Sequence, residues 1–542
     1  MPRFRLRKRK KKEEEQAQAM LTEEQVKARE ERRLYERILG LRAEYRILDN
    51  YPLYDPWARA LILERKSDGS ILYFVDEIPL SEEEREIYKR IMDILYWELE
   101  PAPPGVDPIE HFRNQATSII KRFALRFQST IHPGISWGKV EYYILRDTIE
   151  YDVLTPLMKD PAIEDISCDG VGKPVYVWHQ RYESIPTNIK FTRDEDLDAL
   201  VVKLAHKAGK HVSVAFPIVD AILPEGHRLA ATYKREVSKH GSTFTIRKFR
   251  EKPLSIVDLI RGGTVSTQLA AYFWKLMEYN LTGLIMGVTG AGKTTMLNAI
   301  ATLLRPTIKI VTIEDTPELR LTHENWVQLY SRPSYGFEAG LSEISLYDLV
   351  RVSLRYRPDV LIVGEVRGEE AKVLFQAIAT GHGGITTIHA ESIDAAVKRL
   401  TSPPMDIPPG YIPLVNFAMV IKRVRLPTGA GTHRIVRRVT DVWEIRDYED
   451  YVKIARWDPA TREHEVNLDE SILIPRIAEM TGVDVSDVIE DINRREVVLK
   501  WMALRGMTKY EEVASRIMEY YRRPDKLYNQ AAREVERLER YT

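Results

Sequence analysis

Short apolar runs alternate with helix-forming stretches in the second half of the chain. The apolar runs, predicted as buried strands, are residues 281–286, 309–313, 360–363 and 385–388. The stretches with helical spacing are residues 267–279, 295–304, 346–356 and 371–379. This alternation predicts a parallel, doubly wound α/β sheet. Such sheets bind ligands beyond the carboxyl ends of their strands, so the residues that follow each run are the first candidates for chemistry.

The first half of the chain has a mixed pattern. Residues 61–64 and 71–75 flank Asp68-Gly69, which predicts a β-hairpin. Helices are predicted at residues 81–100, 108–127, 137–159 and 194–207, and further strands at 163–167, 174–179, 228–233 and 242–249. We therefore expect a helix-rich subdomain with the hairpin at 41–159, then an α+β domain at 160–250. A hinge is expected at 251–254, before the parallel sheet.

A complete phosphate-binding sequence lies between the first strand and helix of the parallel sheet. Its residues are Gly287, Val288, Thr289, Gly290, Ala291, Gly292, Lys293 and Thr294, followed by Thr295. A strand delivers such a loop, its glycines let backbone N–H groups surround phosphates, and a helix begins facing the anion. We expect Lys293 to reach the β- and γ-phosphates of ATP and the Thr294 hydroxyl to ligate Mg²⁺. The alternative is a glycine turn before an ordinary helix.

Carboxylates follow two other predicted strands. Glu314 follows 309–313 and Glu365 follows 360–363. Hydrolysis of ATP requires a positioned water and a held metal ion. We expect Glu365 to hold Mg²⁺ through water and Glu314 to orient or deprotonate the attacking water, although the two roles could be exchanged.

Two histidines lie near the last predicted strand. His382 precedes that strand and His389 follows it. Their spacing does not match a helical zinc pair. A neutral imidazole that hydrogen-bonds the γ-phosphate or an acidic strand end would explain each, and a purely structural role is the alternative.

Charge and cysteine content narrow the class of protein. The 542 residues include 80 basic and 80 acidic side chains, so no global field attracts nucleic acid or an anionic membrane. The single Cys168 excludes a disulfide framework and indicates a reducing compartment. No run approaches the ~20 apolar residues that span a bilayer, so a cytoplasmic location is expected. Residues 1–12 carry eight basic side chains, which suit a solvated tail or, alternatively, acidic lipid headgroups or an acidic partner.

Four ordered boxes resemble the secretion-superfamily ATPases, which power type II and type IV secretion and type IV pilus assembly. They are residues 287–294, 313–319, 359–368 and 380–390. The similarity extends over roughly residues 160–425, and the C-terminal region resembles the archaeal branch, particularly the archaellum motor ATPase. One departure is the lack of the zinc-binding cysteine quartet of many bacterial type II members, since the chain has one cysteine.

The resemblance implies a homohexameric ring of RecA-like domains, here 255–430, followed by C-terminal strands and helices at 431–542. It implies that arginines of the N-terminal domain complete the ATP site, and the matching positions are Arg228 and Arg247. Without the family, Arg247 could equally be an exposed strand residue. The implied partner is a polytopic membrane platform protein, with the ATPase peripheral at the cytoplasmic membrane.

Two other functional classes remain open at this point. A RecA-like ring with a basic arm could translocate nucleic acid, although zero net charge and the lack of a recognisable nucleic-acid module argue against this. A nucleotide-gated scaffold with negligible turnover is the second. The presence of Lys293, Glu314 and Glu365 favours catalysis instead.

Overall fold

The computed structural model describes residues 38, 40–103, 105–128, 136–249, 253–332, 343–429 and 432–540. The chain forms two compact units, Met1–Phe249 and Arg250–Thr542. The basic segment 1–12 and residues 251–252 of the expected hinge lie outside the described residues. Among the described helices, none combines the length and hydropathy that crossing a bilayer requires.

The first unit is built on a nine-stranded sheet with the order β1-β2-β3-β6-β5-β4-β9-β8-β7. The strands are β1 (Tyr45–Tyr54), β2 (Ala58–Arg65), β3 (Ile71–Glu77), β4 (Ile163–Cys168), β5 (Pro174–His179), β6 (Glu183–Lys190), β7 (Ile218–Ile222), β8 (Arg228–Thr232) and β9 (Thr243–Arg247). The hairpin expected around Asp68-Gly69 is β2–β3. It joins the later strands through β3 and β6, and Tyr73 enters the same core as Ile166. The hairpin and the α+β region therefore share one core.

The helices of the first unit fall into two groups. They are α3 (Glu82–Glu98), α4 (Pro108–Gln128), α5 (Trp137–Thr148), α6 (Thr155–Lys159) and α7 (Asp194–Lys207). Helices α3, α4 and α5 pack around a small cluster of their own, whereas α7 packs on the sheet. The single helix expected at 137–159 is wrong, because the chain turns at Asp152 (φ 55°) and restarts with Pro156 in the first turn of α6. Proline lacks the N–H that a continuous helix needs, so it favours a new start.

The second unit contains the predicted parallel sheet, extended by antiparallel strands. The strands are β10 (Gly283–Met286), β11 (Ile310–Glu314), β12 (Trp326–Tyr330), β13 (Val360–Val363), β14 (Gly383–Ile388), β15 (Phe417–Gly429), β16 (Thr432–Asp447), β17 (Asp450–Trp457) and β18 (His464–Val466). Their order is β12-β11-β13-β14-β10-β15-β16-β17-β18. The pairs from β12 to β15 are parallel, and those from β15 to β18 are antiparallel. The α/β prediction is confirmed.

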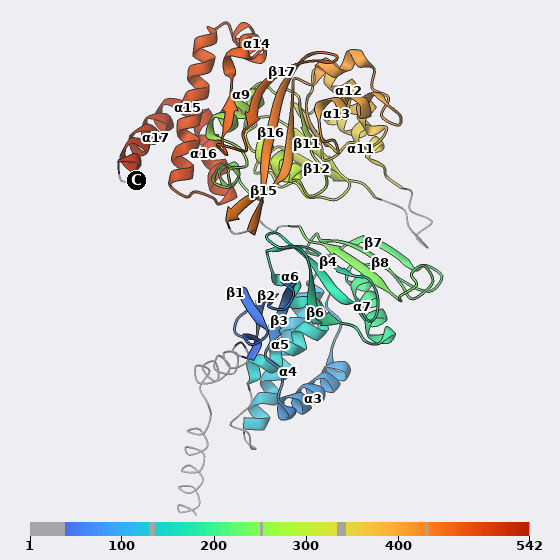
Figure 1. Cartoon of the computed structure of the whole chain (residues 1–542). Helices are drawn as coiled ribbons and strands as arrows, with labels where there is room; N and C mark the ends of the chain where they lie inside the picture. The colour runs from blue at the N-terminus through green and yellow to red at the C-terminus, as the bar shows by residue number, and fades with distance from the viewer. Residues whose placement is uncertain are drawn as a thin grey trace, which may run out of the picture. The chain divides into compact units, whose positions relative to one another are not determined.

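Helices cover both faces of this sheet (Figure 1). One layer contains α11 (Leu346–Ser353), α12 (Glu370–Ala379) and α13 (Ile393–Thr401). The other contains α8 (Ile256–Arg261), α9 (Thr267–Glu278), α10 (Lys293–Ala301), α14 (Leu473–Thr481), α15 (Val485–Leu504), α16 (Tyr510–Arg522) and α17 (Pro524–Glu539). Successive strand residues serve opposite layers: Ile285 packs in one core, while Leu284 and Met286 pack in the other. Burial on both faces explains the continuous apolar runs in the sequence.

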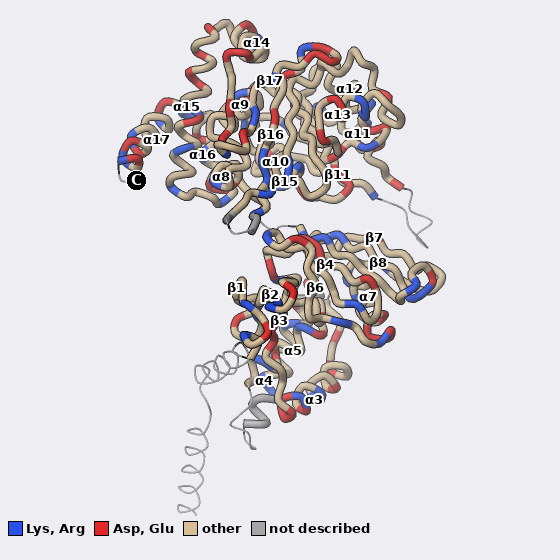
Figure 2. The backbone as a smooth tube through the Cα atoms, viewed as in Figure 1, with Lys and Arg blue, Asp and Glu red and all other residues tan. Residues whose placement is uncertain are grey.

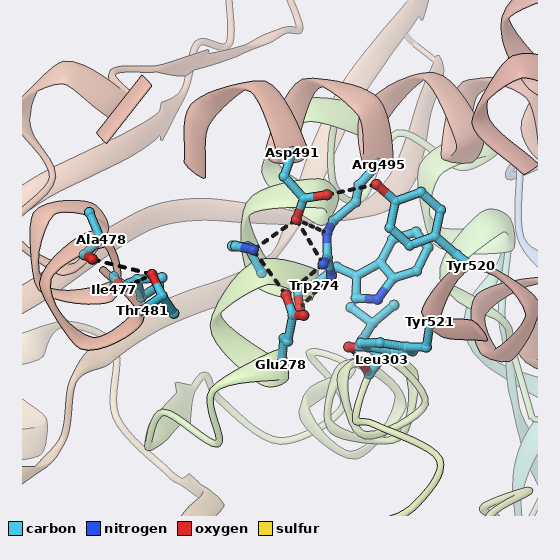
Figure 3. Close-up of polar contacts among 11 residues, drawn as sticks. Trp274, Glu278, Leu303, Ile477, Ala478, Thr481, Asp491, Arg495, Tyr520 and Tyr521 are labelled. Atoms are coloured by element: carbon cyan, nitrogen blue, oxygen red, sulfur yellow. Dashed lines mark hydrogen bonds and ion pairs between the residues drawn. The ribbon is translucent and has the colours of Figure 1, made fainter. Parts of the chain in front are cut away.

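A buried ionic cluster joins the C-terminal helices to α9 (Figure 3). Arg495 of α15 is 2% exposed and pairs with Glu278 of α9 and with Asp491 of its own helix. Lys275 of α9 also pairs with Asp491, at 2.8 Å. The C-terminal segment is therefore an integral layer of the second unit.

Candidate functional site

The phosphate-loop sequence forms the connection between β10 and α10. Gly290 (φ 72°) and Gly292 (φ 101°) adopt left-handed backbone conformations, which L side chains rarely adopt. A Cβ on Gly287 would lie 2.6 Å from the Ile421 carbonyl oxygen, so β15 also requires glycine there. Helix α10 begins at Lys293, and its N-cap residue is Gly292, which has no side chain to cap the first turn. The first N–H groups of α10 thus donate no hydrogen bond to an N-cap side chain, as is common at anion-binding helix starts.

Sheet order brings the other predicted strand ends beside this loop. The neighbours β11, β13, β14 and β10 are all parallel, so their carboxyl ends lie at one edge. Glu314 ends β11, and Glu365 and His389 follow β13 and β14. The edge thereby gathers two acids, an imidazole and the lysine of the loop. Among these four strands, only β13 and β14 are adjacent both in the sheet and in the order of the sequence.

A chain of polar contacts links Lys293 to Glu365 through His389. The Lys293 Nζ lies 3.2 Å from His389 Nδ1, and His389 Nε2 lies 2.9 Å from Glu365 Oε1. Burial and the neighbouring Lys293 cation lower the pKa of His389. Burial also lowers the pKa of Lys293, and the Glu365 carboxylate opposes that shift. A neutral imidazole between an ammonium and a carboxylate can accept from one and donate to the other.

Arg367 extends this chain to a third strand end, and sequence reasoning did not single it out. Its Nη2 lies 2.7 Å from Glu365 Oε2 and its Nη1 lies 3.4 Å from Asp315 Oδ2. Asp315 follows β11, so one guanidinium connects the ends of β11 and β13. The sequence offered one signal for Arg367: it lies two residues after Glu365, where a basic side chain can balance the charges of Glu365 and Asp315.

Glu314 lies in the same region but is held by its own loop. Its Oε1 accepts hydrogen bonds from the backbone N–H groups of Glu318 and Leu319, and its Oε2 accepts one from Gln328 Nε2 at 3.0 Å. The side chain is buried, and burial raises the pKa of Glu314 to about 7 despite these donors. A carboxyl group with such a pKa is suited to exchange a proton near neutral pH.

The structure separates the two predicted histidines. His382 precedes β14, at the amino-terminal edge of the sheet, and its Nδ1 lies 3.0 Å from the Ala377 carbonyl oxygen. His389 lies at the other end of the same strand. A strand of this length spans roughly 20 Å. Within a single chain His389 therefore joins the cluster of strand-end residues, whereas His382 contacts a helix carbonyl at the other edge. A chemical role for either imidazole stays a prediction.

Arg228 and Arg247 lie in the first unit, directly opposite each other on β8 and β9. Arg228 pairs with Asp220 at 2.9 Å, and Arg247 pairs with Asp165 at 3.0 Å. The side chain of Arg247 is 55% exposed. Exposed ion pairs of this kind contribute little to stability, so both arginines can exchange their partners at low cost.

The donor set at the strand ends fits a hard divalent cation. Glu365 Oε1 is buried, and within the described part of the chain it accepts no well-aligned hydrogen bond, although His389 Nε2 lies 2.9 Å away. Thr294 follows Lys293 in the first turn of α10, at the same edge. Mg²⁺ prefers carboxylate, hydroxyl and water oxygens. Thr294 and Glu365 are the residues that would hold it.

Comparison with known proteins identifies the family. The type II/IV secretion system protein family matches residues 152–412. An uncharacterized protein of Methanocaldococcus jannaschii is 36% identical over 392 residues, which cover 71% of this chain and 70% of the relative. The type IV secretion system protein PtlH of Bordetella pertussis is 29% identical over 320 residues, which cover 52% of this chain and 90% of PtlH.

Solved structures give a weaker likeness. The ATPase DotB of Legionella pneumophila is 17% identical, with a TM-score of 0.38, covering 66% of this chain and 92% of DotB. A score below 0.5 does not establish a shared arrangement of the whole chain. Membership rests on the sequence matches. The chain therefore belongs to the type II/IV secretion system protein family.

Proposed function

We propose that this protein is a Mg²⁺-dependent ATPase that drives a secretion or pilus-type machine at the cytoplasmic membrane. The observation that supports hydrolysis best is the polar chain from Lys293 through His389 to Glu365, placed beside a helix start that no side chain caps. A phosphate chain bound there would meet backbone N–H groups, an ammonium and a nearby carboxylate. A scaffold that only binds nucleotide has no need for two acids at the same edge.

Each residue of the loop edge has a defined task in this proposal. Residues Gly287–Thr295 surround the phosphates with backbone N–H groups, and Lys293 turns from His389 to the β- and γ-phosphates. Thr294 and Glu365 hold Mg²⁺, which neutralises phosphate charge when bound. Releasing Lys293 leaves His389 free to hydrogen-bond the γ-phosphate or to stay with Glu365.

Glu314 is proposed as the residue that orients and deprotonates the attacking water. Its raised pKa, about 7, matches a general base near neutral pH. Its Oε2 accepts a hydrogen bond from Gln328 Nε2, and a water can replace that donor. The Oε1 contacts to Glu318 and Leu319 would keep the carboxyl group in place meanwhile.

The machine itself is proposed from the family. Type II/IV membership and the likeness to the secretion protein PtlH support a role in secretion or in assembly of a type IV pilus-like filament, including an archaellum. We infer a homohexameric ring that works on a polytopic membrane platform protein. Arg228 and Arg247 are proposed to complete the ATP site of such a ring. Native mass spectrometry with Mg·ATP tests the hexamer, and a stable monomer would reject the ring.

The function is tested by Lys293→Ala. Loss of the ammonium leaves the developing phosphate charge without its main protein cation, so ATP turnover should fall by at least roughly a hundredfold. Lys309→Ala is the matched control, because Lys309 immediately precedes β11 at the opposite edge of the sheet. Phosphate release is measured for both variants. Substantial turnover in a pure Lys293→Ala preparation would refute the phosphate-loop proposal.

A further inference from the structure

The hairpin of β15 and β16 runs past the end of β10 and along the phosphate loop. Strand β15 pairs with β10 only from Phe417 to Val420, and it then continues to Gly429 beside β16. Ile421, the first residue beyond that pairing, lies against the loop: its Cδ1 would be 3.5 Å from a Cβ on Gly292. The residues that follow Ile421 are thus placed next to the candidate nucleotide site.

This part of the hairpin is strongly basic. From residue 421 to residue 440 the sequence contains no Asp or Glu but has six Lys and Arg residues: Lys422, Arg423, Arg425, Arg434, Arg437 and Arg438. Figure 2 shows basic positions of β15 close to α10. Two pairs of like charges lie directly opposite each other, Lys422 with Arg438 and Arg423 with Arg437. Each cross-strand pair thus concentrates two positive charges at one position of the hairpin.

The two pairs belong to opposite faces of the hairpin, because side chains alternate along a strand. Arg438 donates to the Gly262 carbonyl and lies over the Trp457 ring, so its face packs on the body of the second unit. Arg423 and Arg437 lie on the loop side. Arg437 Nε donates to the Gly290 carbonyl at 3.2 Å, and its Cδ would be 3.1 Å from a Cβ on Gly292.

Arg423 approaches the same turn of the loop from the other strand. Its Nη1 would lie 3.9 Å from a Cβ on Gly290. Two guanidinium groups therefore lie against the segment from Gly290 to Gly292, which leads into the uncapped start of α10. The helix N-terminus, the loop N–H groups and both arginines add positive potential at one place, which favours a bound anion.

We propose that Arg423 and Arg437 are further nucleotide-binding residues that contact the phosphate chain held by the loop of the same chain. The inference rests on the proposed ATP site and adds to it a second, sequence-distant source of positive charge. Guanidinium groups suit this role because they donate in pairs to phosphate oxygens and stay charged at all working pH values. Arg437 donates from Nε to the Gly290 carbonyl, which holds its guanidinium group against the loop.

The test uses the full chain and three probes: ATP, ADP and inorganic pyrophosphate, each titrated by calorimetry with Mg²⁺. Arg423→Gln and Arg437→Gln should each weaken all three affinities by roughly tenfold or more, as expected for a lost charged hydrogen bond. The matched control is Arg434→Gln. It removes the same charge from the same hairpin, but its side chain lies on the opposite face. We expect it to bind all three probes as the wild type does.

Several outcomes separate this inference from simpler explanations. Recovery of most affinity by Arg437→Lys would support a role of charge. A different result would overturn the inference: Arg423→Gln binds normally, whereas Arg437→Gln and Arg437→Lys both lose binding. Arg437 would then only shape the loop. Weakened ADP binding with unchanged pyrophosphate binding would also overturn it, since the arginines would contact the nucleoside. If Arg434→Gln weakened the three affinities equally, the effect would come from the overall positive charge of the hairpin, and the inference would also be overturned.

Failure of the proposed function looks different. A wild-type chain that binds neither ATP nor ADP refutes the ATP site itself. A wild-type chain that binds ATP, with Arg423→Gln and Arg437→Gln indistinguishable from it, overturns only the role of the two arginines. Thermal melting of each variant shows whether the fold is intact. For any variant that melts early, the Arg→Lys substitution at the same position replaces it in the titration.

Discussion

At the scale of residues, the site balances its charges internally. Lys293 contacts His389, His389 contacts Glu365, and Arg367 contacts both Glu365 and Asp315. A bound nucleotide would replace some of these contacts. Lys293 therefore has a polar partner both before and after binding, which avoids the free-energy cost of a buried charge without a partner. Glu314 differs, because backbone N–H groups hold its carboxyl group and burial raises its pKa to about 7.

The raised pKa of Glu314 predicts a pH dependence of stability. An acid whose pKa is higher in the folded state than in the unfolded state stabilises the fold most below its unfolded value, near 4.5. That contribution is lost as pH rises through about 7. The melting temperature of the wild type, relative to that of Glu314→Gln, should therefore fall over this window. A constant difference between the two proteins across the window would contradict the raised pKa.

Substitution of the two acids should distinguish their roles. Glu314→Gln keeps the size of the side chain but removes the base, so it should bind Mg·ATP and hold it unhydrolysed. Glu365→Gln should lower turnover and also shift the Mg²⁺ concentration that gives half-maximal activity. Nucleotide retention and a Mg²⁺ titration measure these effects. A shift of Mg²⁺ dependence in Glu314→Gln alone would reverse the assignment.

At the scale of elements, the C-terminal helices are fixed to α9 by charge as well as by apolar packing. Arg495 lies between Glu278 and Asp491 and against the rings of Trp274 and Tyr520 (Figure 3). Burial alone would raise the pKa of Asp491, but Arg495 and Lys275 hold it down at about 2. Asp491 therefore stays ionised at any physiological pH.

Removing Arg495 should loosen this layer. Arg495→Ala leaves two carboxylates with Lys275 as the remaining cation, and breaking such a buried pair costs about 3–5 kcal/mol. We expect a lower melting temperature and faster proteolysis within α14–α17. Arg533→Ala, an exposed arginine on α17, is the control and should change neither. If Arg495→Ala has the same melting temperature and the same rate of proteolysis as Arg533→Ala, the ionic cluster does not hold the C-terminal helices on α9.

At the scale of the whole molecule, the chain consists of two units, each with its own nine-stranded sheet. The loop site belongs to the second unit, whereas Arg228 and Arg247 belong to the first. P-loop enzymes commonly receive an arginine from another domain or subunit, worth ~10³–10⁵ in rate. Both arginines are paired with half-buried aspartates, and such partly exposed ion pairs contribute little to stability.

The proposed ring predicts a shared active site. Arg247→Ala should bind ATP nearly as the wild type does but hydrolyse it poorly, because the arginine acts mainly on the transition state. Arg235→Ala is the control, since Arg235 also pairs with an exposed aspartate of the first unit. Mixing Arg247→Ala with Lys293→Ala should restore part of the hydrolysis if Arg247 acts across subunits. With subunit exchange shown by fluorescence transfer, no recovery at any ratio would exclude action across subunits.

Most elements of the second unit were predictable because each had a local cause. Both-face burial produces continuous apolar runs such as residues 360–363, which the structure forms as β13 with the same bounds. The loop from Gly287 to Thr294 could be recognised because its glycines, lysine and threonine lie close together in the sequence. In the first unit the same local reasoning failed at Asp152, where a left-handed residue divides the helix expected at 137–159.

Sequence by itself determined the α/β class, the loop and the set of acids and histidines. Only the tertiary structure decided which of them meet, because strand order across a sheet is set by packing between distant segments. It placed His389 between Lys293 and Glu365 and left His382 at the opposite edge. It also brought Arg437 to Gly290, 147 residues away along the chain. Local patterns encode elements, whereas the contacts that assemble a site form between elements.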